Sequence, residues 1–308
     1  MPLLNVIIPI LFSLVPVFQT DALAFGSSEV DVLSDASVAG VEEIIEPQVE
    51  RVYQTRSVGV EVTAPSSIVL DSVSGTVLWS EDEDTKRSIA SLTKLITAAV
   101  LFAEPRDMDD VLTLTGADLR PEGGNRHIYL GEQITVEEAL HAMLIASDNE
   151  ATVALVRHFG YTEETFQQAV QSWLETHYLY ATTIIEPTGL HALNVSTARE
   201  IALITELVFQ NPRLADIAEK SSFSFVTQNT GRTIKLNSTN ILLDSDYRIR
   251  MGKTGYTDEA GGCFVTRAQT PEGHEVISVV LGSASRSERF LDTKAILYWV
   301  YENYRWNY

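Results

Sequence analysis

Ser91 and Lys94 stand three residues apart in RSIASLTKLITAAVLFAE (residues 87–104), a stretch that is otherwise mostly apolar. Residues three apart on a helix share one face, so the serine hydroxyl and the lysine amine can meet. A serine needs a base to become a nucleophile, and burial lowers the pKa of a lysine until it can act as that base. The spacing therefore indicates nucleophilic acyl transfer, unless Ser91 only caps the helix and Lys94 extends to solvent.

Two further short motifs follow in the chain. Ser-Asp-Asn occupies 147–149, and Lys-Thr-Gly occupies 253–255. Each has an ordinary structural explanation: Ser147 and Glu150 fit a helix capping box, and Lys253 fits a surface position on a strand that ends in a turn. The set Ser-x-x-Lys, Ser-Asp-Asn and Lys-Thr-Gly in this order is, however, typical of penicillin-binding proteins and class A β-lactamases. The three motifs together favour a serine enzyme of this superfamily.

Strands at both ends of the folded part and helices in the middle must position these motifs. Residues 67–80 are predicted to form a hairpin, which the last strands of the chain are expected to join in one antiparallel sheet. Helices are expected from about Ser91, over 136–159 with a break at Ser147-Asp148, over 196–210, and over 287–304. The pattern predicts an α/β (α+β) fold with an antiparallel sheet and a helical middle.

The composition excludes some partners. The 308 residues carry a formal net charge of -20, so a phosphate backbone would be repelled and nucleic acid is not an expected partner. Cys263 is the single cysteine, which excludes a disulfide within the chain, and it is expected to be buried in a strand. The histidines form no HExxH pair, and no cysteine–histidine cluster suggests zinc, so no metal site is indicated.

Residues 1–24 have the features of an export signal. The apolar run LLNVIIPILFSLVPVF precedes Ala22-Leu23-Ala24, which fits an A-x-A cleavage site, although no lysine or arginine precedes the run. An uncleaved anchor or a misassigned start is the alternative. Residues 25–57 are acidic and weakly periodic, so we expect a solvated linker. The catalytic domain is expected over 58–308, exported to the periplasm or to the outer face of the cytoplasmic membrane and the cell wall.

The segments IASLTKLITA, EPTGLHALNVSTARE, NSTNILL and KTGYTDEAGGCFV extend the three motifs. They resemble the D-alanyl-D-alanine carboxypeptidase family of low-molecular-mass penicillin-binding proteins, which are serine peptidases. The resemblance covers roughly residues 58–305. It implies a β-lactamase/transpeptidase-like fold, in which an antiparallel sheet with flanking helices meets a helical lobe and the site lies between them. The predicted order of strands, helices and strands agrees with that fold.

The resemblance assigns catalytic roles to the first two motifs. Ser91 would be the acylated nucleophile, and Lys94 would be its general base. Ser147 would relay protons, and Asn149 would hold the side chain or backbone amide of the substrate. These roles come from the family's motifs, whereas the spacing alone supports only the pairing of Ser91 with Lys94.

The third motif would bind the substrate. Lys253 would be a second cation that keeps Lys94 neutral and attracts the substrate carboxylate, to which Thr254 would also donate a hydrogen bond. Gly255 would let a peptide lie against the strand backbone. The backbone N–H groups of Ser91 and Tyr256 would form the oxyanion hole. Strand alternation by itself would send Lys253 and Thr254 to opposite faces, so their shared role is implied by the resemblance.

The implied substrates are peptidoglycan stem peptides that end in D-Ala-D-Ala. Ser91 would attack the last peptide bond, D-alanine would leave, and water would hydrolyse the acyl-enzyme. β-Lactam antibiotics would be covalent inhibitors of the same serine. The resemblance implies no need for a metal or an organic cofactor.

Other functions remain open at this stage. Asp148 stands where these carboxypeptidases often have glycine, and Tyr256 where they often have histidine. These departures, with the short stretch after the third motif, leave a D,D-endopeptidase that cleaves peptidoglycan cross-links as the main alternative. A β-lactamase would need a deacylating glutamate, for which Glu186 is a candidate. A penicillin-sensing binding module is the remaining possibility. Arg286 and Arg289, near the last helix, could reach a carboxylate, but they are expected to be surface residues.

Overall fold

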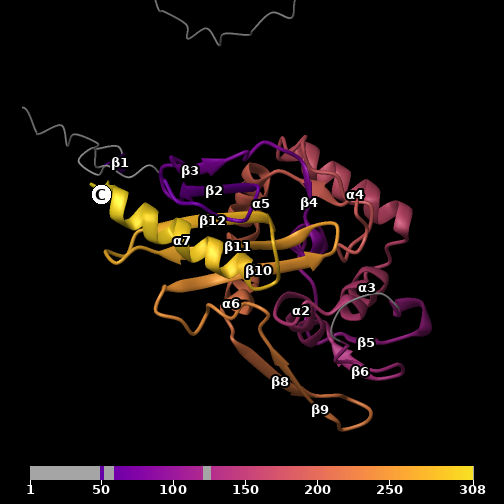
Figure 1. Ribbon diagram of the computed structural model, residues 1–308. Coiled ribbons are helices and arrows are strands. Elements are labelled where there is room, and N and C mark those ends of the chain that lie inside the picture. Colours follow the sequence, from indigo (N-terminus) through magenta and orange to yellow (C-terminus); the bar gives the residue numbers. More distant parts are fainter. Residues whose placement is uncertain (1–48, 52–58, 121–125, 308) are drawn as a thin grey trace, which may run out of the picture. The chain divides into compact units, whose positions relative to one another are not determined.

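The computed structural model describes residues 49–51, 59–120 and 126–307 (Figure 1). The expected export signal and most of the expected linker lie outside these ranges. Inside the range expected to be linker, strand β1 (Val49–Arg51) pairs antiparallel with strand β13 (Tyr304–Trp306). None of the helices in the described ranges is long and apolar enough to cross a membrane.

Five strands form one antiparallel sheet in the order β10-β11-β12-β2-β3. The predicted hairpin is confirmed as β2 and β3, and β12 pairs with β2, so the last strands join the hairpin as expected. The bounds are β2 (Ser66–Asp71), β3 (Val77–Glu81), β10 (Ile249–Thr257), β11 (Gly261–Gln269) and β12 (Glu275–Ser283). Strand β10 carries the Lys-Thr-Gly motif and lies at an edge of this sheet.

The sheet is covered on both faces, so alternate side chains enter two separate cores. On β2, Ile68 and Leu70 pack into the core shared with the helical lobe, whereas Val69 packs into the core shared with helix α7 (Glu288–Asn303). Helix α5 (Ala198–Phe209) contacts the lobe side of the sheet, and Figure 1 shows α7 lying across the other face. Every residue of β2 is therefore buried.

The helical lobe carries the first two motifs. A 3-10 turn, η1 (Ala90–Leu92), contains Ser91 and leads into α1, so the helix expected from about Ser91 begins two residues later. The expected break at residues 147–148 is confirmed, because it separates α2 from α3. Helices α4 and α6 were not predicted. The bounds are α1 (Thr93–Leu101), α2 (Val136–Leu144), α3 (Asn149–His158), α4 (Glu163–Thr176) and α6 (Pro212–Ala218).

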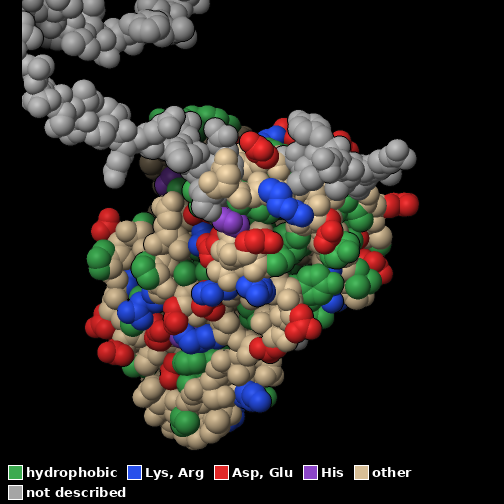
Figure 2. All heavy atoms as spheres, turned by 90° about the vertical axis from the view of Figure 1, so that its left-hand side faces the viewer, with side chains coloured by type: hydrophobic (Ala, Val, Ile, Leu, Met, Phe, Trp, Pro, Cys, Tyr) green, Lys and Arg blue, Asp and Glu red, His purple; other side chains and the backbone are tan. Residues whose placement is uncertain are grey.

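Short strand pairs complete the fold. Figure 1 shows the hairpin of β8 and β9 projecting from the body, separate from the main sheet. The bounds are β4 (Arg87–Ser88) with β7 (Val195–Ser196), β5 (Val111–Thr113) with β6 (Gln133–Thr135), and β8 (Ser222–Val226) with β9 (Thr233–Asn237). Cys263 on β11 is buried as expected, and burial raises the pKa of its thiol to about 11. On the face in Figure 2, acidic and basic side chains are interspersed.

Candidate active site

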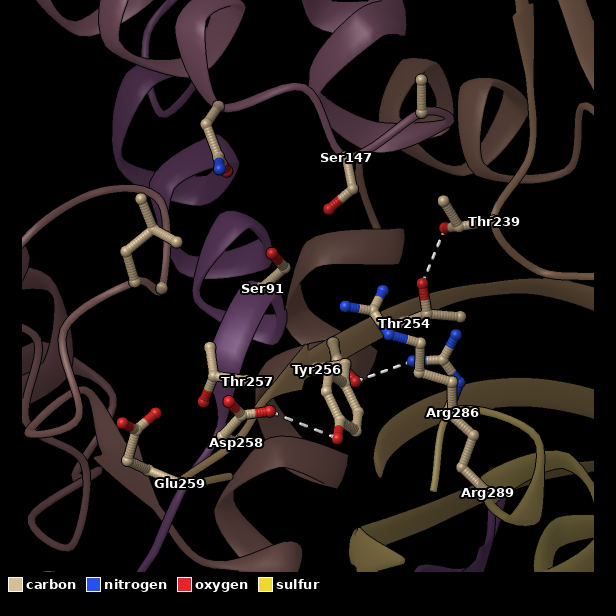
Figure 3. A pocket seen from close by; sticks show the side chains of 15 residues that line it. Ser91, Ser147, Thr239, Thr254, Tyr256, Thr257, Asp258, Glu259, Arg286 and Arg289 are labelled. Atoms are coloured by element: carbon tan, nitrogen blue, oxygen red, sulfur yellow. Dashed lines mark hydrogen bonds between the residues drawn. The ribbon is translucent and has the colours of Figure 1, made fainter. Parts of the chain in front are cut away.

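The three motifs meet at a cavity of about 560 Å³ between the helical lobe and the edge strand β10. Each motif supplies lining residues, and Figure 3 shows the hydroxyl groups of Ser91 and Ser147 facing the same hollow. The two lysines lie behind this surface, since Lys94 is fully buried and Lys253 is 1% exposed. Six of the eight predicted site residues line the cavity, namely Ser91, Ser147, Asn149, Thr254, Gly255 and Tyr256.

The amine of Lys94 has three oxygen neighbours. Its Nζ lies 3.0 Å from Ser91 Oγ, 2.7 Å from Asn149 Oδ1 and 2.6 Å from Thr188 O. A neutral amine has two hydrogens and one lone pair. The amide and carbonyl oxygens can only accept, so they take both hydrogens. The lone pair is then left for the hydroxyl of Ser91, which is the arrangement that a general base requires.

The surroundings of Lys94 favour the neutral amine. Burial lowers the pKa of Lys94 from 10.5 to about 7, because a charged ammonium loses its hydration inside the protein. The carboxylates of Glu186, Asp148 and Glu150 act in the opposite direction and favour the charged form. The result is a lysine that changes its protonation state near neutral pH.

Lys253 joins the second motif to the third. Its Nζ donates to Ser147 Oγ at 2.8 Å and to Thr254 O at 3.0 Å. Burial and then the positive charges of Lys94 and Arg289 hold the pKa of Lys253 well below its ordinary value. Ser147 therefore has a buried amine beside its hydroxyl, as Ser91 has.

The ordinary explanations of the three motifs are wrong in this structure. Lys94 does not reach solvent, and the turn that contains Ser91 has no side-chain cap. The side chain of Asp148, not that of Ser147, caps α3 by accepting from Ala151 N. Lys253 is buried and not on the surface. Ser147 has a φ of 60°, a backbone conformation that residues with a side chain rarely adopt, and such strain is concentrated at functional sites.

Gly255 allows β10 to lie close to η1, the turn that contains Ser91. A Cβ atom at this position would lie 2.9 Å from both Ile89 O and Ser91 N, and 3.0 Å from Ala90 Cβ. Real Cβ atoms almost never come this close to backbone atoms, so any side chain here would push β10 and the turn apart. The glycine of the third motif thus fixes the distance between the strand and Ser91.

Arg289 is a site residue that sequence reasoning missed. It was expected on the surface, but it is 7% exposed, lines the cavity, and donates from Nη1 to Gly255 O at 2.7 Å. Arg286 also lines the cavity and stacks over the ring of Tyr256 at 4.3 Å. Thr254 Oγ1 lies nearby and donates to Thr239 Oγ1 at 2.6 Å. Hydroxyls and guanidinium groups in one part of the cavity suit a carboxylate ligand.

Several known proteins are similar to this chain. A family model described as D-alanyl-D-alanine carboxypeptidase matches residues 51–285. The D-alanyl-D-alanine endopeptidase of Pseudomonas aeruginosa is 29% identical over 242 residues, which are 78% of each chain. The D-alanyl-D-alanine carboxypeptidase DacC of Escherichia coli is 30% identical over 251 residues, which are 77% of this chain and 61% of that protein.

A solved structure has the same fold as this chain. The crystal structure of the Streptomyces K15 DD-transpeptidase superposes with a TM-score of 0.75 at 24% sequence identity, and the match covers 80% of this chain and 100% of that one. The predicted β-lactamase/transpeptidase-like fold is therefore confirmed. For the described residues, no group of three or more His, Cys, Asp or Glu side chains could hold a metal ion.

Proposed function

This chain belongs to the D-alanyl-D-alanine carboxypeptidase family, and we propose that it hydrolyses the terminal bond of peptidoglycan stem peptides that end in D-Ala-D-Ala. The observation that carries the proposal is the contact of the buried Lys94 amine with Ser91 Oγ at 3.0 Å. An amine with a pKa of about 7 can accept the proton of the serine when the hydroxyl attacks a carbonyl carbon.

In the proposed reaction, Ser91 Oγ attacks the carbonyl of the penultimate D-alanine while Lys94 takes the hydroxyl proton. The backbone N–H groups of Ser91 and Tyr256 stabilise the oxyanion. Lys94 passes this proton on to Ser147, which is hydrogen-bonded to Lys253 and gives its own proton to the leaving nitrogen, so that D-alanine departs with a neutral amine. Water then attacks the ester while Lys94 takes one of its protons and returns it to Ser91 Oγ, which frees the serine and the shortened peptide.

Substrate binding is proposed along β10. The carboxylate of the terminal D-alanine would lie near Thr254 and Arg289, with the buried amine of Lys253 behind them. Asn149 would hold an amide of the stem, because its side chain lines the cavity while its Oδ1 accepts from Lys94. The backbone of β10 at Gly255 can pair with an extended peptide, because this strand is at the sheet edge.

Gly255→Ala is expected to slow acylation of Ser91 by benzylpenicillin by about 10²-fold, because the clash with Ile89 O and Ser91 N displaces the nucleophile by a substantial fraction of an ångström. Stopped-time mass spectrometry of the intact protein measures this rate. Gly116→Ala is the control, since a Cβ there meets nothing within 4 Å. Equal rates for Gly255→Ala and the wild type would contradict the proposed role of the glycine.

Cleavage of cross-links is a second candidate function. Two of the relatives that match this chain over 78% of their own length are named D-alanyl-D-alanine endopeptidase, at 29% and 28% identity. A cross-link offers the same D-Ala carbonyl, with a larger amine as the leaving group. The same serine and lysine would cleave it. The two functions therefore differ in the size of the leaving group that the cavity can accommodate.

A β-lactamase is disfavoured by the position of Glu186. Its two carboxylate oxygens already accept hydrogen bonds from the backbone N–H groups of residues 188–191, and Glu186 does not line the cavity. A deacylating base needs a free oxygen beside the ester to activate water. We therefore propose that a penicillin adduct on Ser91 persists. Export to the periplasm or to the outer face of the membrane belongs to the same proposal, because the substrate is outside the cytoplasm.

The test is to incubate the full chain with a mixture of pentapeptide monomer and cross-linked dimer and to identify the products by mass spectrometry. We expect each monomer to lose one alanine, whereas a monomer with a C-terminal amide should react poorly because it lacks the carboxylate. Conversion of dimer to monomers would move the assignment to the endopeptidase. If neither substrate changes, the peptidase proposal fails.

A further inference from the structure

We infer that Glu186 is a positioning residue for the general base: its carboxylate holds residues 187–191 so that Thr188 O stays in contact with Lys94 Nζ. The inference rests on the proposed function, in which Lys94 is the base. Glu186 itself touches neither Ser91 nor the cavity. Its influence therefore has to pass through the loop and through its charge.

The carboxylate of Glu186 accepts six hydrogen bonds from five residues that follow it. The donors are Thr188 N at 2.8 Å, Thr188 Oγ1 at 2.6 Å, Gly189 N at 2.6 Å, Leu190 N at 2.8 Å, His191 N at 3.3 Å and Asn194 Nδ2 at 3.2 Å. Hydrogen bonds to an ionised group are stronger than those between neutral groups. These bonds also hold the pKa of Glu186 below its ordinary value although burial opposes them. One anion thus fixes an otherwise irregular stretch of backbone.

Residues 187–190 contact helix α1 and the turn that contains Ser91, or line the cavity. Pro187 O accepts from Thr97 Oγ1 at 2.8 Å, and Thr188 O accepts from Lys94 Nζ at 2.6 Å. Gly189 lies so close to the turn η1 that a Cβ at this position would be 2.0 Å from Ala90 O. The next residue, Leu190, lines the cavity. Residues 187–191, which we call the Glu186 loop, therefore form one wall of the pocket around Lys94. The shape of this loop sets the position of the Lys94 amine.

Removing the charge of Glu186 also changes the electrostatics of the base. The charged groups that act on Lys94 are the carboxylates of Glu186, Asp148 and Glu150, which favour the ammonium form. Lys253 on β10 is also near, and the charge of Lys94 lowers the pKa of that second amine. Among the three acids, Glu186 has the largest effect on Lys94. Its loss should therefore lower the pKa of the base. The rise of the acylation rate with pH, which follows deprotonation of Lys94, should then move to lower pH.

Glu186→Gln tests both effects. The amide has the same shape, but its NH₂ group would face at least two of the donors that now bind an oxygen. We expect acylation of Ser91 by benzylpenicillin to reach a plateau about 10²-fold below that of the wild type, with the midpoint of its pH dependence at lower pH. The rate is measured by mass spectrometry of the full chain between about pH 5 and pH 10.

Asp118→Asn is the matched control. Like Glu186, Asp118 is a carboxylate that accepts several hydrogen bonds, here four from Thr115 and Arg157. It is fully buried, whereas Glu186 is partly exposed, and it is not among the groups that act on Lys94. Its amide variant should keep the plateau and the midpoint. Wild-type behaviour of Glu186→Gln, or a lower plateau with an unmoved midpoint, would overturn the inference, the latter because it would leave Glu186 a merely structural role.

A second variant covers the case in which Glu186→Gln does not fold, which circular dichroism would reveal. Thr97→Val removes the hydroxyl that donates to Pro187 O and keeps the shape of the side chain and the charge of Glu186. We expect a several-fold slower plateau with an unmoved midpoint, and a wild-type plateau would contradict the role of the loop. If the wild type itself forms no adduct with benzylpenicillin, it is the proposed function that fails.

Discussion

Ser91→Ala is expected to lower kcat/KM for release of D-alanine from a pentapeptide by roughly 10⁴- to 10⁶-fold, because it removes the hydroxyl that contacts the Lys94 amine. The variant should also form no covalent adduct with benzylpenicillin. Alanine release is measured by an enzyme-coupled assay, and the adduct is measured by the mass of the intact protein.

Ser172→Ala is the control for this prediction. Ser172 is exposed on α4, so its replacement should leave both alanine release and adduct formation unchanged. An adduct that survives in Ser91→Ala would point to Ser147, whose hydroxyl also lies beside a buried amine and faces the same hollow (Figure 3). That result would reverse the proposed roles of the two serines.

Lys94→Met is expected to slow acylation of Ser91 by about 10²- to 10⁴-fold, which is the range that general-base catalysis contributes. In the wild type, the rate should rise with pH with a midpoint of about 7, because Lys94 accepts the serine proton only after it has lost its own. The variant has no amine to titrate, so this rise should disappear. The measurement is the rate of adduct formation as a function of pH.

Lys235→Met is the matched control for the loss of a lysine. Lys235 is exposed on β9, outside the residues that line the cavity, and its replacement should change neither the rate nor its pH dependence. If Lys94→Met kept the wild-type dependence with its midpoint near 7, the base would have to be another group, and Lys253 would be the first to test.

The features that could be predicted from the sequence are those encoded by local spacing or by a short motif. The contact of Ser91 with Lys94 follows from positions three apart, and the β2–β3 hairpin follows from two β-rich runs around a turn. The break before α3 was also predicted, but its capping residue was not. Asp148 and Ser147 are adjacent and both common at caps, and only the backbone geometry of Ser147 shows which of them caps the helix.

The features that were missed depend on contacts between distant parts of the chain. Arg289 looks like a surface residue at the start of α7, and it enters the site because α7 packs on the sheet and directs it toward Gly255 O, 34 residues away in sequence. Thr254 was named as a substrate-binding residue from the resemblance alone, and it lines the cavity at the open edge of β10. Glu186 was considered only as a base. Its hydrogen bonds go mostly to backbone N–H groups, which every residue except proline has, so the sequence could not predict them.

The two buried lysines also have a consequence for proton linkage in folding. In the unfolded chain their pKa returns to about 10.5, whereas in the fold both values are lower. Between the folded and unfolded values the unfolded chain binds more protons, so these groups make folding more favourable as pH rises through that window and less favourable as it falls. For Lys94 the window runs from about 7 to 10.5. Near neutral pH, the groups that make the serine reactive therefore lower the stability of the fold, which the apolar cores on both faces of the sheet must offset.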